Sequence, residues 1–221
     1  MLAIEIFDAY IDWLRQNAPL SFENLAPPAH PAELDALEDA IGHELPIEVR
    51  AILSRHNGQN RYMSAKGAHG VPVIPTLNFL STAMIRGAWS FWTIYWDDPE
   101  LDNYNDMAGV FPGVDGLIKP IYTSRGWIPL WSTPIDRQYV GLDLDPGPDG
   151  EAGQIINFGI DDETHFICAS DFTELLQILL EEVRSGSWQP SMSWSGPWFG
   201  DPKKQFTNTL FERFNSRVNG R

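Results

Sequence analysis

Apolar residues near the start of the chain recur every three or four positions, which is the period of an amphipathic helix. Ile4, Phe7, Ile11 and Leu14 follow this spacing. Because residues at such intervals share one side of a helix, they form a continuous apolar stripe. The pattern therefore predicts an N-terminal helix over about residues 2–16 that packs its stripe against the rest of the protein.

Two short helices are predicted between about Pro31 and His56. Pro31 suits the first helical position, and Gly42 suits the residue that ends a helix in a left-handed conformation. A Leu-Pro pair at positions 45–46 then restarts the helical pattern. The predicted inward residues are Leu34, Leu37 and Ile41 in the first helix and Val49, Ile52 and Leu53 in the second, which Asn57-Gly58 would cap.

The segments around these helices are less regular. Residues 19–28 and 59–75 are predicted to be loops, the second with room for one short strand. The aromatic run 88–96 is either the end of a helix or a strand, and residues 97–116 are acidic and rich in turn formers. Between them, a helix is predicted over about residues 77–87, with Leu77, Leu80, Met84 and Ile85 facing inward.

Strand signals concentrate in the middle of the chain, between about residues 118 and 169. Val140, Leu142 and Leu144 alternate with Gly141, Asp143 and Asp145, the period of a half-buried strand. Pro146 to Gly150 contains two prolines and two glycines, and this composition predicts a tight turn. Further strands are predicted at residues 118–122, 127–131, 154–156 and 165–169.

A closing helix is predicted from about Phe172 to Gly186, with Ser170 or Asp171 as its N-cap. The order of helices, then strands, then a helix indicates an α+β fold and not a doubly wound sheet. Residues 1–186 are predicted to be one domain. Residues 187–221 are predicted to be a Trp-rich extension packed on that domain, irregular at first and then helical from Asp201-Pro202.

The overall composition favours a folded, acidic protein. Hydrophobic residues make up 43% of the 221 residues, so the chain is able to bury a core, and the formal net charge is -15. Phosphate groups would repel such a surface, which disfavours nucleic acids and anionic membranes as partners. A basic protein partner, or simply solubility, accounts for the charge.

The location is expected to be cytoplasmic. The single cysteine, Cys168, excludes an intrachain disulfide and falls within a predicted buried strand. No run approaches the roughly 20 apolar residues of a membrane span, and residues 1–10 lack the positive charge that opens a secretory signal.

Neither a metal site, a cofactor site nor a catalytic group is predicted. A calcium loop that begins at Asp143 or Asp145 would need an acid at Gly147 and a later Glu that is missing. Gly147, Gly150 and Gly153 lie between two strands, whereas a phosphate-binding loop should open a helix. No Gly-x-Ser-x-Gly nucleophile motif is present, and Cys168 is expected to be a buried structural thiol.

The abundant carboxylates and the nine tryptophans leave sugar chemistry open, since glycosidases use paired acids and tryptophan stacks on sugars. Trp13, Trp127 and Trp131 occupy positions that suit a core. Trp188, Trp194 and Trp198 stand in the Pro- and Ser-rich tail and must be buried on something. We expect that surface to be the protein's own, with a partner as the alternative.

Two blocks of the chain carry a recognisable set of residues. They are Leu34, Leu37, Glu38, Ile41, Gly42, Leu45, Pro46, Asn57 and Gly58 in the first block, and Trp127, Pro129, Leu130, Leu142, Asp143, Pro146, Gly150, Gly153, Gln154, Ile155, Ala169, Ser170, Phe172 and Leu175 in the second. In order and spacing these residues resemble the SUKH superfamily, the Smi/Knr group named after fungal regulators of cell-wall glucan synthesis. The resemblance runs from about residue 31 to residue 186, and the segment 133–141 departs from the usual Gly-Asp before the acidic strand.

This resemblance implies an α+β domain with a central antiparallel sheet flanked by helices. The family has no established catalytic set, and many bacterial members resemble immunity proteins. The first hypothesis is therefore a non-enzymatic immunity protein that binds and neutralises a cognate basic toxin such as a nuclease. The second is a regulatory or scaffolding protein of cell-wall synthesis, and the third is a carbohydrate-active enzyme. The candidate partner-binding acids are Asp143, Asp145, Asp149, Glu151, Asp161, Asp162, Glu163, Asp97, Asp98, Glu100, Asp102 and Asp106.

Overall fold

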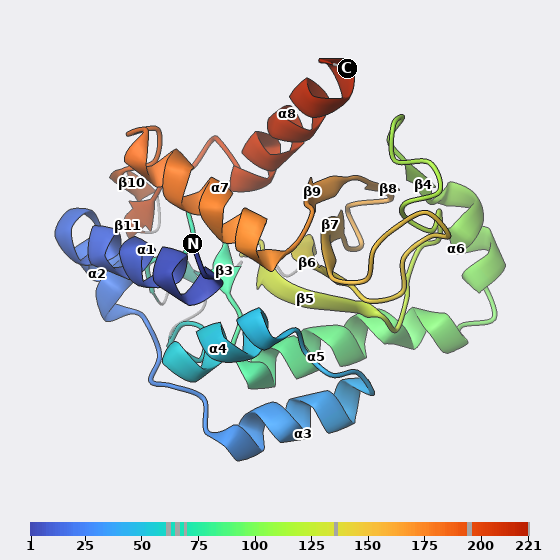
Figure 1. Ribbon diagram of the computed structural model, residues 1–221, viewed down its shortest axis with the longest axis horizontal. Helices are drawn as coiled ribbons and strands as arrows, with labels where there is room; N and C mark the ends of the chain where they lie inside the picture. Colours follow the sequence, from blue (N-terminus) through green and yellow to red (C-terminus); the bar gives the residue numbers. More distant parts are fainter. Residues whose placement is uncertain (61–62, 65–66, 69, 135–136, 194–195, 221) are drawn as a thin grey trace.

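A computed structural model describes residues 1–60, 63–64, 67–68, 70–134, 137–193 and 196–220 of the chain. In these residues eight α-helices surround a central five-stranded antiparallel sheet (Figure 1). This arrangement confirms the predicted α+β fold.

The central sheet has the strand order β3-β5-β6-β7-β9. Helix α7 (Phe172–Arg184) packs against β7 and β9, whereas α5 (Thr82–Thr93) packs against β5. Figure 1 shows these two helices on opposite sides of the sheet. The strands are β3 Asn78–Phe79, β5 Trp127–Ser132, β6 Tyr139–Asp143, β7 Gln154–Phe158 and β9 Ile167–Ala169.

Strand β6 differs from the half-buried strand that its alternating pattern predicts. Every residue from Tyr139 to Asp143 is buried, because β5 and β7 flank the strand and helices cover the sheet. Gly141 fits this position because a Cβ there would lie 2.1 Å from the carbonyl oxygen of Ile128 on the neighbouring strand. The polar residues of this strand therefore point into the protein and not toward solvent.

The N-terminal helices largely follow the prediction. Helix α1 covers Ala3–Asn17, α3 covers Pro31–Ile41 and α4 covers Ile47–Arg55. Gly42 ends α3 with a φ of 72°, as expected for its left-handed stop. The predicted loop 19–28 is partly wrong, because Pro19–Glu23 forms the short helix α2 with its proline in the first turn.

Helix α5 begins later than its hydrophobic pattern suggests. Ser81 caps the helix by accepting a hydrogen bond from the Met84 N–H at 3.3 Å. Leu77 and Leu80 are buried around edge strand β3 and not on the helix face, so the prediction of a helix from residue 77 is wrong at its start. The aromatic run completes α5 and continues as the 3₁₀ helix η1, Ile94–Asp97.

The acidic stretch and the segment after it hold further differences. Leu101–Met107 forms helix α6, and Gly109–Val110 forms β4, which pairs in parallel with β8, Thr164–His165. The strand predicted over residues 118–122 is absent from this described segment, where Ile118 makes only a bridge to Asp115. Instead, the Leu117 carbonyl supports the following turn by accepting the Gly147 N–H at 3.0 Å.

The C-terminal residues form a hairpin that was not predicted and the last helix that was. Strands β10 (Pro190–Ser193) and β11 (Gly196–Phe199) form a hairpin, and α8 covers Phe206–Asn219, starting later than Asp201-Pro202 suggests. Two more short strands, β1 (Met63–Ser64) and β2 (Gly67–Ala68), pair elsewhere.

The tail packs its aromatic residues on the body of the protein. Trp188, Phe199 and Phe206 have no exposed surface. The Phe206 ring lies 5.3 Å from that of Trp188 and 6.3 Å from that of Trp131 on the central sheet. Trp198 is also buried, whereas Trp194 lies outside the described residues. These contacts place the first half of the tail and the start of α8 in the hydrophobic core.

Candidate functional site

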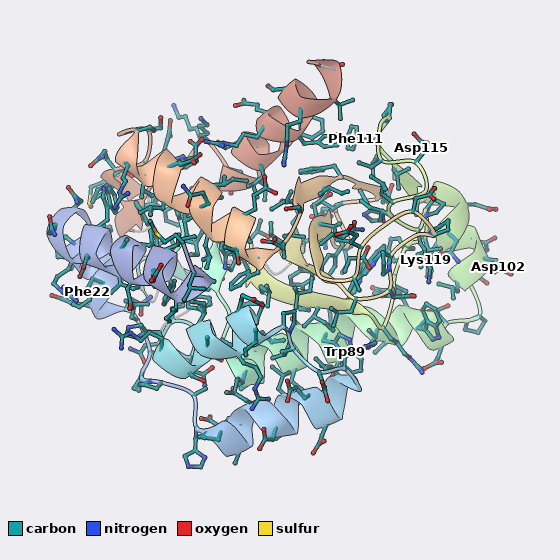
Figure 2. The ribbon with its side chains drawn as sticks, viewed as in Figure 1. Phe22, Trp89, Asp102, Phe111, Asp115 and Lys119 are labelled. Atoms are coloured by element: carbon teal, nitrogen blue, oxygen red, sulfur yellow. The ribbon has the colours of Figure 1, made fainter. Side chains whose placement is uncertain are left out.

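The predicted acids gather at one end of the molecule. Residues 97–163 contain 14 acidic and only three basic side chains, so this segment carries most of the formal charge of -15. We call the charged surface of this segment the acidic end. Figure 2 labels Asp102, Asp115 and Lys119 on this side of the molecule.

Backbone pairing brings the distant acids together. The Gly109 N–H donates to the Glu163 carbonyl at 2.8 Å, which places the end of α6 beside the loop that carries residues 161–163. The Asp149 N–H donates to the Gly116 carbonyl at 2.9 Å and draws the 146–150 turn to the same segment. Residues 109–119 therefore lie between three groups of acids that are up to 66 residues apart in sequence.

Most of the predicted acids are accessible there. Asp145 and Asp162 are half-buried, as is Asp98. Asp115 is also exposed. It was not among the acids expected to bind a partner, although it lies inside the acidic run 97–116. The exposed candidates are Asp97, Glu100, Asp102, Asp106, Asp149, Glu151, Asp161 and Glu163.

Three acids are already neutralised by the basic residues of the segment. Arg125 binds Asp97 at 2.8 Å, Arg137 binds Asp161 at 2.6 Å, and Lys119 binds Asp145. The other predicted acids make no ion pair within the described part of the chain. The remaining carboxylates give the acidic end a net negative potential that would attract a cationic partner.

Large apolar side chains are exposed on the same stretch of chain as the acids of residues 97–106. Phe91 is 49% exposed, Ile94 57%, Trp96 37% and Met107 55%. The first three come from the end of α5 and from η1, and the fourth comes from α6. We call these four residues, together with Asp97, Asp98, Glu100, Asp102 and Asp106, the apolar–acidic surface.

A cluster of packed aromatic rings connects the elements that carry this surface. The ring of Tyr95 lies 5.7 Å from that of Tyr104 and 5.5 Å from that of Tyr122, which in turn lies 5.0 Å from buried Trp92. Burial, with a smaller contribution from Tyr95, raises the pKa of Tyr122 to about 12. The cluster joins η1, α6 and the loop before β5, so the exposed residues stand on packed structure.

Asp143 is not part of the recognition surface, because its side chain is fully buried. Trp127, Asp143 and Gln154 lie opposite one another on three adjacent strands. The Asp143 carboxylate accepts hydrogen bonds from the Trp127 Nε1–H at 3.1 Å, the Gln154 Nε2–H at 2.9 Å and the Asp145 N–H at 3.0 Å. The sequence-based expectation that Asp143 binds a partner is therefore wrong: the residue holds the sheet and its turn together.

This placement also bears on sugar chemistry. The Asp143 carboxylate accepts a hydrogen bond from the Trp127 indole and has no exposed surface. Asp143 and Asp145 therefore do not face each other across an open cleft. Trp127 and Trp131 are buried in the core. The geometry that would favour a glycosidase at this pair is therefore not formed.

Stability should fall between about pH 4 and pH 7 because of Asp143. Burial raises its pKa to about 6, above its ordinary value of 3.8, and the hydrogen bonds to Gln154, Asp145 and Trp127 oppose this only in part. Between these two pKa values the folded protein binds a proton that the unfolded chain has released. The free energy of unfolding therefore falls as pH rises, until Asp143 is also ionised in the folded protein above about pH 6. Urea unfolding of the wild type and Asp143→Asn at several pH values should show the wild type losing stability relative to the variant as pH rises. A relative gain would contradict the burial argument.

Other chemically active groups are sparse. Burial raises the pKa of the Cys168 thiol well above its ordinary value, so the thiol stays protonated and unreactive at neutral pH. Among the residues with described positions, no three His, Cys, Asp or Glu side chains are arranged to hold a metal ion. No helix in the described ranges is both long and apolar enough to cross a membrane.

A pocket adjoins the acidic end beside α8. It has a volume of about 570 Å³ and is lined on one side by Asp161, Asp162 and Glu163. Phe111, Phe166 and Phe211 form its apolar wall, and Figure 2 labels Phe111 near α8. These phenylalanines come from separate parts of the chain, and no spacing in the sequence links them.

Comparison with known proteins identifies a matching family and relatives of similar sequence. Residues 28–178 match the family described as the SMI1 / KNR4 family (SUKH-1). The chain is 28% identical over 184 residues to the cell wall biosynthesis/cell cycle regulator smi1 of Schizosaccharomyces pombe, covering 80% of this chain and 35% of that protein.

Two further relatives carry related names. The cell wall assembly regulator SMI1 of Saccharomyces cerevisiae is 35% identical over 89 residues, covering 40% of this chain and 17% of that protein. The glucan synthesis regulatory protein of Neurospora crassa is 26% identical over 207 residues, covering 80% of this chain and 37% of that protein. The matched part of the chain thus covers between 17% and 37% of the length of these three relatives.

Proposed function

Because the chain belongs to the SMI1/KNR4 family (SUKH-1), we propose that it is a non-enzymatic protein-binding module with a regulatory or scaffolding role in cell-wall synthesis. The names of three relatives, which describe regulators of cell-wall biosynthesis, cell-wall assembly and glucan synthesis, support this role. The observation that carries the proposal in this chain is the apolar–acidic surface.

The composition of that surface suits a protein partner. Exposed aromatic and aliphatic side chains supply the desolvated contacts that dominate binding energy, and Phe91, Ile94 and Trp96 offer such contacts. The surrounding acids would guide a basic partner and set its orientation, since complementary charge affects association rate and specificity more than affinity. The same charge repels nucleic acids.

The choice between regulation and toxin neutralisation depends on the relatives. The immunity hypothesis expected first from the sequence has no support in the names of these relatives, which favour the alternative of cell-wall regulation. A basic partner suits either role, so charge does not separate them. The regulatory role is therefore the one we propose.

Ile94→Glu is expected to abolish capture of the partner. Ile94 is 57% exposed within the apolar–acidic surface, so a carboxylate there would replace an apolar contact with a desolvated charge and add repulsion to the acids nearby. The tagged wild-type chain, expressed in its own cells and crosslinked, should retain enzymes of cell-wall polysaccharide synthesis or their regulatory subunits. Quantitative mass spectrometry should show that the variant loses them by about tenfold or more.

Ile47→Glu provides the matched control, because Ile47 is 77% exposed on α4, outside the apolar–acidic surface. It should leave capture unchanged. Equal loss with both variants, or equal retention with both, would overturn the assignment of this surface. Recovery of a toxin in place of cell-wall enzymes would support the neutralising role instead.

A further inference from the structure

The pocket between α8 and the loop of residues 159–163 combines an aromatic wall with carboxylates. The ring of Phe211 lies 4.7 Å from that of Phe111 and 5.1 Å from that of Phe166. Phe166 is almost fully buried, whereas Phe111 and Phe211 are partly exposed to the pocket. At about 570 Å³ the pocket falls within the range of sites that bind small ligands or single side chains.

The carboxylates of the pocket are not equally available. Arg137 donates from Nε and Nη2 to Asp161, both at 2.6 Å, and so neutralises it. Asp162 accepts a hydrogen bond from the neutral Gln138 amide at 3.3 Å. Neither Asp162 nor Glu163 has an ion-pair partner in the parts of the chain whose positions are described. Two negative charges therefore remain uncompensated beside the aromatic wall.

The Asp162 carboxylate is the group in this pocket that an adjacent cation would stabilise most. Burial raises the pKa of its carboxyl to about 6, and hydrogen bonds from Asn157 and Gln138 oppose that rise only in part. At neutral pH the carboxylate is mostly ionised in a site that disfavours charge, and an adjacent positive group would relieve this cost. Among the residues that the structure describes, the pocket lining includes neither Lys nor Arg.

A neighbouring carboxylate in the same loop already binds an arginine side chain. Asp161, the neighbour of Asp162, receives a guanidinium group through two parallel hydrogen bonds from Arg137. Guanidinium groups bind carboxylates in this forked manner and also stack on aromatic faces, and they give up water more easily than an ammonium group does. Phe111 and Phe211 provide such faces for the guanidinium and for its apolar stem.

We propose that this pocket binds an arginine side chain from a basic segment of the protein partner, with its guanidinium at Asp162 and Glu163 and its stem against Phe111 and Phe211. This inference rests on the proposed function and names the chemistry of the partner. It also makes α8 part of the binding site, because that helix supplies Phe211.

Titration of the whole isotope-labelled chain with the peptide acetyl-Ala-Arg-Ala-Arg-Ala-amide tests the pocket by NMR. The amide signals of Phe111, Glu163 and Phe211 should shift and saturate. The double variant Asp162→Asn/Glu163→Gln should weaken binding by about tenfold or more, because it removes both uncompensated charges. Phe211→Leu keeps an apolar side chain without the aromatic face, and it should weaken binding by about twofold to fivefold.

Matched controls separate this site from general attraction. The double variant Asp149→Asn/Glu151→Gln removes the same charge from exposed positions outside the pocket and should bind the peptide as the wild type does. Equal weakening by the two double variants, or shifts that avoid the pocket amides, would overturn the proposal. Equal affinity for the lysine or glutamine version of the peptide would overturn the assignment to arginine.

The outcome for the pocket is distinguishable from that for the apolar–acidic surface. If Asp162→Asn/Glu163→Gln still captures the cell-wall enzymes and the arginine peptide does not bind the wild type, the pocket is refuted and the proposed function stands. If the peptide binds in the pocket and Ile94→Glu captures the same proteins as the wild type, the surface assignment fails and the pocket stands.

Discussion

Trp127→Ala is expected to lower the free energy of unfolding by about 3–5 kcal/mol, the range for removing a large aromatic side chain from a packed core. Trp127 has no exposed surface, and its ring lies 5.6 Å from that of Phe158 and 4.8 Å from that of His165. The substitution also removes the indole N–H that binds the buried Asp143 carboxylate. Thermal unfolding should show a decrease in Tm of roughly 10 °C, since 1 kcal/mol shifts a protein of this size by about 2–4 °C.

Two further variants test the origin of this loss of stability: one isolates the hydrogen bond of Trp127, and the other removes an exposed tryptophan as a control. Trp127→Phe keeps most of the ring but leaves Asp143 without that donor, so it should cost about 1–3 kcal/mol. Trp96→Ala removes the same side chain from a position that is 37% exposed and should cost clearly less than Trp127→Ala. Equal losses at Trp127 and Trp96 would show that the Trp127, Asp143 and Gln154 row does not anchor the sheet.

Phe206→Ala should destabilise the whole protein by about 3–5 kcal/mol, although the residue lies in the C-terminal tail. Phe206 is fully buried between Trp131 of the central sheet and Trp188, and its backbone N–H donates to Thr76 Oγ1 at 3.0 Å. Because these contacts join α8 to the central sheet, their loss should destabilise the whole protein, which should still unfold in one transition. Urea unfolding followed by circular dichroism measures the change.

Phe91→Ala is the matched control for this prediction, because Phe91 is 49% exposed and should cost well under half as much. A separate, earlier unfolding step of the tail in Phe206→Ala would contradict the view that residues 187–221 share the core. An unchanged transition midpoint would contradict it as well. A single transition shifted to lower urea concentration is the expected result.

The regular helices and central strands are predictable from the sequence because their signals are local. The 3.6-residue period marks α1, α3, α4 and α7, and Pro31 and Gly42 bound α3 at the expected positions. Apolar runs likewise mark β5 and β7. In each case the residues that specify the element lie within one or two turns or strand lengths of one another.

Other elements are decided by residues far away in the chain. Leu77 and Leu80 have helical spacing, yet pairing with β5 places residues 78–79 in a strand. The Trp- and Pro-rich tail forms a hairpin because the buried Trp188 and Phe199 pack on other parts of the protein, including Trp13. Periodicity does not record such partners, so tertiary packing overrides the local pattern.

The candidate site shows the same division. The sequence by itself determined that the chain is acidic, that its acids concentrate in residues 97–163, and that Trp127, Asp143 and Gln154 mark its family. The burial of Asp143 and the accessibility of its acidic neighbours are visible only in the tertiary structure. Burial depends on which helices cover the second face of the sheet, and the local sequence does not specify this. The tertiary structure also decided which acids are neutralised by arginine or lysine. The phenylalanine wall of the pocket comes from the residues that directly follow β4 and β8 and from α8, which only the folded chain brings together. Composition and periodicity are properties of neighbouring residues, whereas exposure and charge pairing arise only when distant segments pack together.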